Sequence, residues 1–279
     1  MLPRLPKALV RAVLVVLLVI TPSLFLATAA ADGAEIMALV AIFAALFTLV
    51  EYSSAAPSII EFRDAPPYNR LRFIALFATV LALSFSVGGG GDSSNIVKLL
   101  HLLAERVGAA VDFPYSPVRL VVLMMPAGTP ETVLESLRIA AGLAYLISLV
   151  AIVTFVLLLR LKRWPNRRGT FNVWVNLPTF DPTAGGDVVA RLNRDSQVNL
   201  ILGFLLPFLI PALVKVMSFF ATPLTLNDPH TMIWMVTAWA FLPASLLMRG
   251  VALNRIAYMI QRQRKQAYDR AVADGMLPV

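Results

Sequence analysis

Long uninterrupted runs of hydrophobic residues recur along the chain, and the polar residues gather between them. A strand of a membrane barrel would instead alternate hydrophobic and polar residues over about ten positions. Inside lipid, every backbone N–H and C=O group needs a partner within the spanning structure, so continuous runs predict helices. The pattern therefore predicts an all-α, polytopic integral membrane protein, a single membrane domain over residues 1–279 with about six transmembrane helices. The predicted spans cover residues 9–30, 34–55, 71–90, 139–161, 198–220 and 231–253.

The first run admits a second interpretation, because it follows a basic segment and ends in small residues. Residues 27–31 read ATAAA, which resembles the A-x-A cleavage site of a signal peptide. Residues 1–31 would then be removed from the mature protein. The run is nevertheless longer than a usual signal core and long enough to cross a bilayer. We therefore expect it to be retained as an anchor, and either interpretation leaves the later topology unchanged.

Lysine and arginine are unequally distributed among the segments that join the spans. With the N-terminus placed inside, nineteen of the 24 basic residues fall on the side of both termini, four fall on the other side, and Lys215 lies within a span. Bacterial membrane proteins concentrate basic residues in their cytoplasmic segments. The distribution predicts a bacterial inner-membrane protein with both termini in the cytoplasm. It also accounts for the net charge of +8, so no nucleic-acid partner is expected.

Three polar segments lie outside the predicted spans: a periplasmic insert (88–138), a cytoplasmic loop (162–197) and a basic cytoplasmic tail (254–279). In the insert, hydrophobic residues at helical spacing over 96–107 predict an amphipathic helix. That helix either lies at the outer membrane interface or packs on the bundle. In the loop, alternation over 171–177 indicates a short extended piece. The glycine-rich stretch before Asp187 indicates a turn followed by a helix cap.

The chain carries few residues suited to catalysis. It contains no cysteine and two histidines, and 14% of its residues are charged against 58% hydrophobic. Thiolate metal sites, iron–sulfur clusters and a cysteine nucleophile are therefore excluded, and a histidine-rich metal or haem site is not expected. The motifs of serine hydrolases, zinc proteases and phosphate-binding loops are missing from the sequence. We expect no catalytic, cofactor-binding or metal-binding site and interpret the protein as not an enzyme.

Two ionisable residues fall within or beside hydrophobic runs. Glu51 directly follows the second run, and Lys215 lies within the fifth. Charged side chains in a bilayer are costly and often functional, so both are candidate intramembrane polar sites. The alternative for Glu51 is a carboxylate at headgroup level. Lys215 instead reaches the outer interface or pairs with Asp228, and we favour these structural roles.

Prolines interrupt the last two spans, Pro207 and Pro211 in the fifth and Pro243 in the sixth. Each proline removes a backbone hydrogen bond and kinks its helix. Kinks at similar depth suggest helix hinges or a broken-helix site of the kind that transporters use. Ordinary kinked packing is the simpler interpretation, because proline is common in membrane helices.

The most distinctive polar stretch, residues 61–70, joins the second and third spans. Two consecutive prolines stiffen it, and aromatic residues stand beside paired charges. Short rigid loops of this kind suit partner docking, although a capped turn is the simpler interpretation. The candidate docking residues are Phe62, Arg63, Asp64, Tyr68 and Arg70.

These observations favour a non-enzymatic inner-membrane accessory, scaffold or assembly protein of a larger membrane complex. The spans carry few polar groups that would select a solute, whereas the distinctive polar sequence lies outside them. The expected partners are the lipid bilayer, anionic lipid headgroups at the cytoplasmic face and another membrane protein. The alternative is a small-solute or lipid transporter that uses the kinked fifth and sixth helices. A polar cavity at mid-membrane depth would favour the transporter, and a solid bundle would favour the scaffold.

Overall fold

The computed structural model describes residues 4–26, 31–88, 95–161, 164, 165, 171–181, 183, 185–220 and 225–274. Side chains are described in these ranges except at 31–34, 95–97 and 100. All regular secondary structure in the described ranges is helical, which confirms the all-α prediction. The helices are α1 (Leu5–Phe25), α2 (Ala31–Ser53), α3 (Tyr68–Gly88), α4 (Asn95–Val111), α5 (Pro117–Leu123), α6 (Glu131–Leu161), α7 (Val173–Asn176), α8 (Val188–Met217) and α9 (Pro229–Ala273).

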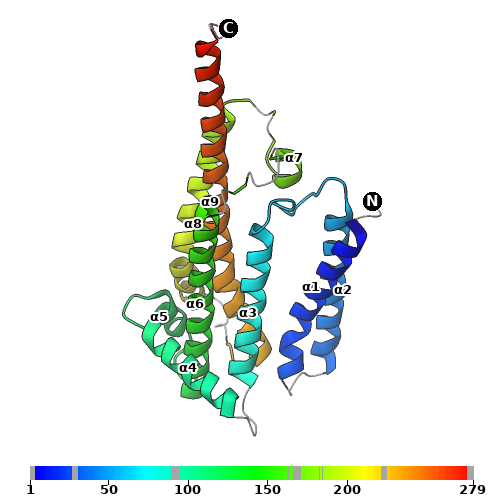
Figure 1. Cartoon of the computed structure of the whole chain (residues 1–279). Helices are drawn as coiled ribbons and strands as arrows, with labels where there is room; N and C mark the ends of the chain where they lie inside the picture. Colours follow the sequence, from blue (N-terminus) through cyan, green and yellow to red (C-terminus); the bar gives the residue numbers. More distant parts are fainter. Residues whose placement is uncertain are drawn as a thin grey trace.

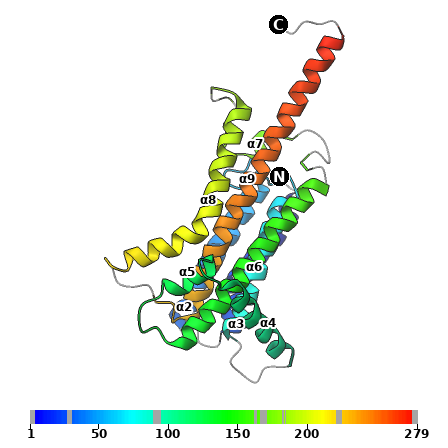
Figure 2. The same cartoon turned by 90° about the vertical axis from the view of Figure 1, so that its left-hand side faces the viewer.

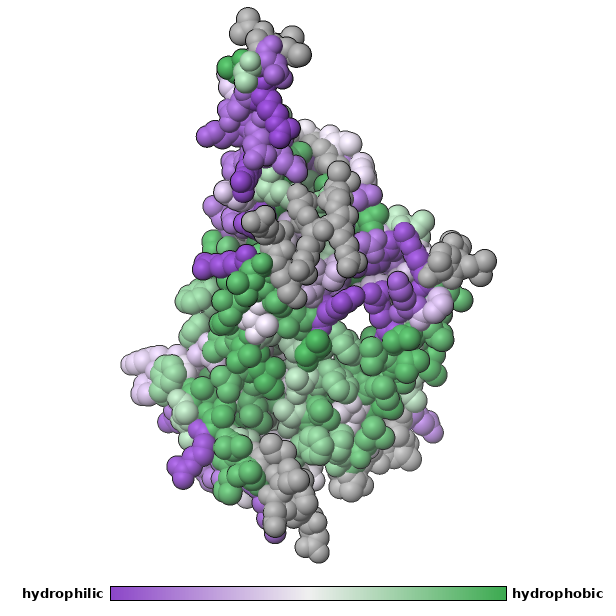
Figure 3. Space-filling view, in the orientation of Figure 1, coloured by the Kyte–Doolittle hydropathy of each residue, from purple (hydrophilic) through white to green (hydrophobic). Residues whose placement is uncertain are grey.

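Six of these helices, namely α1, α2, α3, α6, α8 and α9, are long and hydrophobic enough to cross a membrane. They run along a common direction, and both ends of the chain lie toward the same end of the bundle (Figure 1). We call this the terminal end, and we call the opposite end, where α4 lies, the distal end. Large hydrophobic side chains such as Phe43 and Phe204 are 64% and 65% exposed on the outer faces. So extensive a hydrophobic surface (Figure 3) is typical of a protein that faces lipid.

Three of the helices extend beyond the predicted spans, because hydropathy marks only the hydrophobic part of a helix. Helix α6 begins at Glu131 and α8 at Val188, ahead of the spans predicted from 139 and 198, and α9 continues to Ala273, past the span predicted to end at 253. The predicted loop 162–197 therefore contains the first turns of α8. The 45 residues of α9 make a helix of about 68 Å, which exceeds a hydrocarbon core of about 30 Å.

Side-chain caps fix where the polar helix ends begin. The Asp187 carboxylate accepts a hydrogen bond from the Ala190 N–H at 3.1 Å, which confirms the predicted cap of α8. Asp228 caps α9 in the same way, and Pro229 occupies the first helical position that suits proline. The prediction of an extended piece at 171–177 is wrong. The Asn172 side chain caps a single helical turn there, which is α7.

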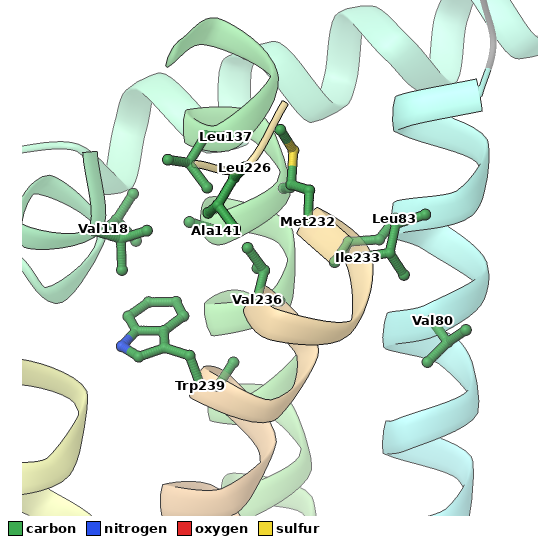
Figure 4. Packing of buried hydrophobic residues seen from close by; sticks show 14 of the residues in the cluster. Val80, Leu83, Val118, Leu137, Ala141, Leu226, Met232, Ile233, Val236 and Trp239 are labelled. Atoms are coloured by element: carbon green, nitrogen blue, oxygen red, sulfur yellow. The ribbon is translucent and has the colours of Figure 1, made fainter. Parts of the chain in front are cut away.

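Two hydrophobic clusters hold the bundle together, one at each end. The distal core joins α1, α3, α5, α6 and α9, and Ile233, Val236 and Trp239 are among its members from α9 (Figure 4). The terminal core joins the α2–α3 connection, α6, α8, α9 and the segment around α7. Its fully buried side chains include Phe62, Phe155 and Ile256. The polar segments at the terminal end are thus anchored to the terminal core, which is separate from the distal core.

Glycines allow two pairs of helices to approach closely. A Cβ atom at Gly142 of α6 would lie 2.7 Å from the Gly108 Cα of α4, so the amphipathic helix packs directly on the bundle. Of the two positions that the sequence left open for this helix, packing on the bundle is the one observed. At the α8–α9 crossing, a Cβ atom at Gly203 would lie 2.8 Å from the Pro243 carbonyl oxygen. These contacts leave no room for a side chain.

Helices α1 and α2 form a hairpin that touches the rest of the bundle mainly through α1. At the distal end, α1 packs tightly on α3. The Phe25 and Phe85 rings lie 4.3 Å apart, and a Cβ atom at Gly88 would lie 2.7 Å from the Phe25 carbonyl oxygen. Toward the terminal end α1 and α3 diverge (Figure 1). Of the predicted cleavage region 27–31, residues 27–30 lie outside the described residues.

Candidate functional site

The connection between α2 and α3, residues 54–67, is anchored by Glu51. This residue lies in the last turn of α2 and is 4% exposed. Its carboxylate accepts hydrogen bonds from the backbone N–H groups of Ser58, Ile59 and Ile60 at 3.0–3.1 Å. These amides replace the water that a buried carboxylate loses. The contacts of Glu51 are therefore those of a residue that builds the connection.

Arg63 complements Glu51 from the other side of the connection. Its guanidinium group donates hydrogen bonds to the carbonyl oxygens of Glu51 at 3.1 Å, Ser54 at 2.8 Å and Ala55 at 3.2 Å. Carbonyl groups at the end of a helix lack a helical partner, and a cation there also interacts favourably with the helix dipole. The Arg63 side chain is only 2% exposed. Arg63 thus caps α2 from inside the protein.

Aromatic side chains fill the space beneath the connection. Phe62 and Tyr68 are 0% and 1% exposed, and their rings lie 4.4 Å apart. The Phe155 ring of α6 lies 5.6 Å from Tyr68, and the Trp164 ring lies 5.7 Å from Phe62. The Trp164 indole also donates a hydrogen bond to the Ala65 carbonyl oxygen at 3.1 Å. These four rings belong to the terminal core, on the side that faces the connection.

The candidate docking residues therefore divide into two groups. Asp64 and Arg70 are exposed, whereas Phe62, Arg63 and Tyr68 are buried within the chain. The five residues therefore do not form one exposed surface on this chain, and their role in docking stays a prediction. The two rings turn inward because burial of an aromatic side chain is strongly stabilising, and Arg63 turns inward because α2 ends in unpaired carbonyl groups.

Residues far away in the sequence hold the connection against the bundle. The Asn176 carbonyl oxygen accepts from the Phe62 N–H at 2.7 Å, and its side-chain oxygen accepts from the Asp64 N–H at 3.1 Å. Arg249 of α9 donates two hydrogen bonds to the Glu61 carboxylate, at 2.6 and 2.7 Å. Both Glu61 and Arg249 are partly buried, and two-point arginine–carboxylate pairs are strong and directional.

A cleft of about 1700 Å³ lies beside this connection, between the α1–α2 hairpin and α3, α8 and α9. Figure 3 shows the hollow, with hydrophilic surface along its upper edge and hydrophobic surface below it. Seven cationic and two acidic side chains contribute to its lining. The cationic residues are Arg4, Lys7, Arg11, Arg63, Arg70, Arg72 and Arg249. The excess of cations makes the cleft suited to an anion.

Three of the seven cations already have protein partners. Arg63 and Arg249 are occupied as described, and Arg4 donates to the carbonyl oxygens of Ser54 at 3.2 Å and Ala55 at 3.4 Å. The other four have no carboxylate within 4.0 Å among the residues that the structure describes. We call these four the uncommitted cations: Lys7, Arg11, Arg70 and Arg72.

Aromatic rings position two of the uncommitted cations. The guanidinium carbon of Arg11 lies 4.0 Å from the centre of the Tyr52 ring. The guanidinium carbon of Arg72 lies 5.3 Å from the Tyr68 ring and 5.8 Å from the Phe241 ring. Such contacts stabilise a cation without neutralising it. The Nε atom of Arg72 is buried and has no hydrogen-bond partner in the described part of the chain.

Hydrophobic side chains line the cleft farther from the terminal end. They come from Leu14 of α1, Ile74 of α3, Leu206 of α8 and Leu242 of α9. Leu14, Ile74 and Leu242 are 40%, 60% and 54% exposed, so they are accessible from the cleft or from lipid. The cleft is therefore amphipathic, with cations toward the terminal end and a hydrophobic floor toward the middle of the bundle.

The prolines predicted as hinges lie beside this floor, since Pro207 and Pro243 each follow one of its leucines. Figure 2 shows α8 turning away from α9 in its second half. Pro211 has no N–H group to donate to the Pro207 carbonyl oxygen. The Trp239 indole of α9 donates to that oxygen instead, at 3.0 Å. The contact ties the bend of α8 to α9.

Lys215 lies at the opposite end of the bundle from the cleft. Its ammonium group donates a hydrogen bond to the Met125 carbonyl oxygen, at 3.1 Å, in the segment after α5. The suggested pairing with Asp228 is wrong, because the Asp228 carboxylate accepts from the N–H and hydroxyl groups of Thr231, both at 2.7 Å. These hydrogen bonds lower the pKa of Asp228, so it remains an anionic cap of α9. Lys215 and Glu51 do not meet.

Metal ligands do not gather in the described residues, where no group of three or more histidine, cysteine or carboxylate side chains is placed to hold an ion. His101 is exposed on α4, 4.0 Å from Glu105. His230 stands at the start of α9 and has both ring nitrogens buried without a described hydrogen-bond partner. Neither imidazole lines the cleft.

The start of α8 is linked to the extended part of α9 by an exposed ion pair. Arg264 donates to the Asp187 carboxylate at 2.6 Å and holds the pKa of Asp187 below its ordinary value of 3.8. A lowered pKa means that the link is intact above about pH 4 and is lost as the pH falls through the lowered value. We expect the two segments to separate only when the pH falls below the lowered pKa of Asp187.

Spin labels measure this separation directly, because the chain contains no cysteine. With labels introduced by Gly185→Cys and Tyr268→Cys, the distance distribution should broaden on acidification. Asp187→Asn keeps a good helix cap but removes the ion pair, so its distribution should already be broad at pH 7. A distribution that stays narrow in this variant at every pH would contradict the assignment.

Sequence reasoning missed the cleft because it counted the basic residues only for topology. Lys7 and Arg11 are four residues apart and therefore lie on one face of α1. This spacing is the one local signal of the site. Arg72 of α3 lines the same cleft only because of tertiary packing, which no local pattern predicts. Comparisons of the chain with protein-family models, with curated proteins and with solved structures find no match.

Proposed function

We propose that this protein is a non-enzymatic lipid carrier that binds an anionic amphiphile in the cleft beside the α1–α2 hairpin. The observation that carries the proposal is the position of uncommitted cations above a hydrophobic floor. A negatively charged headgroup fits the uncommitted cations, and an acyl or isoprenyl chain fits the hydrophobic floor. This favours the transporter alternative, because the cleft reaches the kinked parts of α8 and α9.

The proposed location is the inner membrane of a bacterium, with the terminal end in the cytoplasm. The basic residues concentrate in the segments at the terminal end, as the positive-inside rule requires of cytoplasmic segments. The cleft then opens at the level of the cytoplasmic leaflet. Anionic lipids of that leaflet attract basic side chains near the surface by about 1 kcal/mol each. The α4 segment would lie on the periplasmic side.

Lipid analysis of the purified protein tests the proposal. We expect an anionic amphiphile to remain bound through purification in mild detergent, and mass spectrometry of the extracted lipids will identify it. Arg72→Gln should reduce the bound amount about tenfold, since a charged hydrogen bond contributes about 1.5–3 kcal/mol. Arg106→Gln is the matched control, because Arg106 is exposed on α4 and far from the cleft. Equal recovery from both variants would contradict the proposal.

A second function, that of a scaffold, is favoured by the end of α9. Residues 261–270 are all exposed and include four basic side chains, and the helix projects beyond the bundle (Figure 1). A projecting basic helix suits docking onto an acidic surface of another membrane protein. Co-purification of a partner that requires residues 261–273 but tolerates Arg72→Gln would favour this function over the carrier.

A further inference from the structure

The two sides of the cleft each present uncommitted cations. Lys7 and Arg11 belong to α1, whereas Arg70 and Arg72 belong to α3, and all four line the same cleft. Like charges that share a cavity repel one another unless an anion lies between them. The opposing positions therefore call for a ligand that meets both helices at once. A group bound to one helix alone would leave the other pair uncompensated.

Arg72 is the cleft residue that most clearly needs an oxygen atom of a ligand as a hydrogen-bond acceptor. Its Nε–H is buried and lacks an acceptor among the described residues, and a buried donor without an acceptor is destabilising. The Tyr68 and Phe241 rings beside it offer π-faces but no strong acceptor. Arg11 on the opposite side is likewise placed over the Tyr52 ring. Both guanidinium groups are positioned by rings and retain free donors.

The α1–α2 hairpin makes this bridge structurally significant. At the distal end α1 is fixed to α3 by the contact of Phe25 with Phe85 and Gly88. At the terminal end the cleft separates the same two helices. Arg4 reaches only to the end of the partner helix α2 and its connection, at Ser54 and Ala55. An anion between Arg11 and Arg72 would therefore join the hairpin to the bundle.

We infer that the ligand is a lipid with a terminal phosphate, a phosphate monoester or diphosphate, whose headgroup bridges Arg11 and Arg72. This inference rests on the proposed carrier function and narrows its ligand class. A terminal phosphate carries about 1.5–2 negative charges at pH 7 and three acceptor oxygens. It can accept from two arginines on opposite sides. A phosphodiester has one charge and two free oxygens, so it satisfies only one side fully. The lipid chain lies along Leu14, Ile74 and Leu242.

Native mass spectrometry of the full-length protein in detergent tests the inference. The probes are phosphatidic acid, which ends in a phosphate monoester, and phosphatidylglycerol, a phosphodiester with the same acyl chains. We expect phosphatidic acid to bind about tenfold more tightly, the difference of one charged contact. Arg11→Gln and Arg72→Gln should each reduce its affinity to that of phosphatidylglycerol. Arg160→Gln, an exposed position outside the cleft, should change neither affinity.

The outcomes separate the inference from the function on which it rests. If both lipids bind with equal affinity and Arg72→Gln abolishes the binding of both, the assignment of a terminal phosphate is contradicted. The proposed carrier function is then still supported. Binding of neither lipid would overturn both. Displacement of phosphatidic acid by an equal concentration of inorganic pyrophosphate would mean that a soluble phosphate is the ligand, which overturns the lipid assignment. If Arg72→Gln does not fold, Arg11→Gln carries the test, because Arg11 is half-buried and its one described contact is with the Tyr52 ring.

Discussion

Replacement of Arg63 by methionine is expected to destabilise the protein by about 3 kcal/mol, because three carbonyl groups at the end of α2 lose a charged donor whose side chain is buried. Methionine has a similar length but cannot donate a hydrogen bond. The carbonyl oxygens of Glu51, Ser54 and Ala55 would then be left at the end of α2 with fewer partners. The measurement is the temperature at which half of the detergent-solubilised protein loses its monodisperse peak in size-exclusion chromatography.

Arg70→Met is the matched control for this variant. Arg70 lies in the same part of the chain but is exposed, so the same substitution should leave the unfolding temperature almost unchanged. Arg63→Lys should fall between the two, since an ammonium group keeps the charge without the planar fork. Equal stability of Arg63→Met and Arg70→Met would show that the buried cap contributes nothing.

Gly203→Val is expected to separate α8 from α9. A Cβ atom at this position would lie 2.8 Å from the Pro243 carbonyl oxygen and 2.9 Å from the Leu247 backbone nitrogen. Backbone atoms cannot turn away as a side chain can, so the helices must move apart. Overpacking of this kind costs about 1–3 kcal/mol and sometimes more. Thermal unfolding in detergent should reveal the loss, and a cysteine cross-link across the crossing should form more slowly.

Gly185→Val provides the control for the glycine substitution. A Cβ atom at Gly185 meets no other atom within 4 Å, and its backbone is not in the left-handed region. The same chemical change should therefore leave stability and the α8–α9 distance as they are. If Gly203→Val is as stable as Gly185→Val, the two helices are not in the close contact described.

Hydropathy was sufficient to predict the six long helices and the all-helical fold, because a hydrophobic run of this length has few other solutions in lipid. It was not sufficient for the polar helix ends. The first turns of α8 depend on the Asp187 cap, and the last turns of α9 carry no hydrophobic stripe at all. A cap identifies where a helix starts, and the sequence did identify Asp187. The one local mark of where α9 stops is Gly275, which follows the C-cap residue Asp274 in the sequence and is a residue type common just after a helix.

The polar residues were harder to place than the spans, because their partners are distant. The sequence presents Glu61 as one charge in a rigid loop, and only the fold brings Arg249 to it from 188 positions away. The sequence presents Tyr68 as a candidate docking residue, whereas in the fold Phe155 and the connection enclose it. The cleft depends on the angle between α1 and α3, a quantity that hydrophobic patterning does not encode.

Glu51 and Arg63 bond to groups no more than twelve positions away, whereas Glu61 bonds to a residue near the end of the chain. During synthesis, chains fold from the N-terminus as they emerge. The hydrogen bonds of Glu51 and Arg63 can therefore form once residue 63 has left the ribosome, before the residues that hold the connection against the bundle have been made. The attachment of the connection through Arg249 waits for the last helix. The wall that α9 contributes to the cleft is thus the last of its walls to be made.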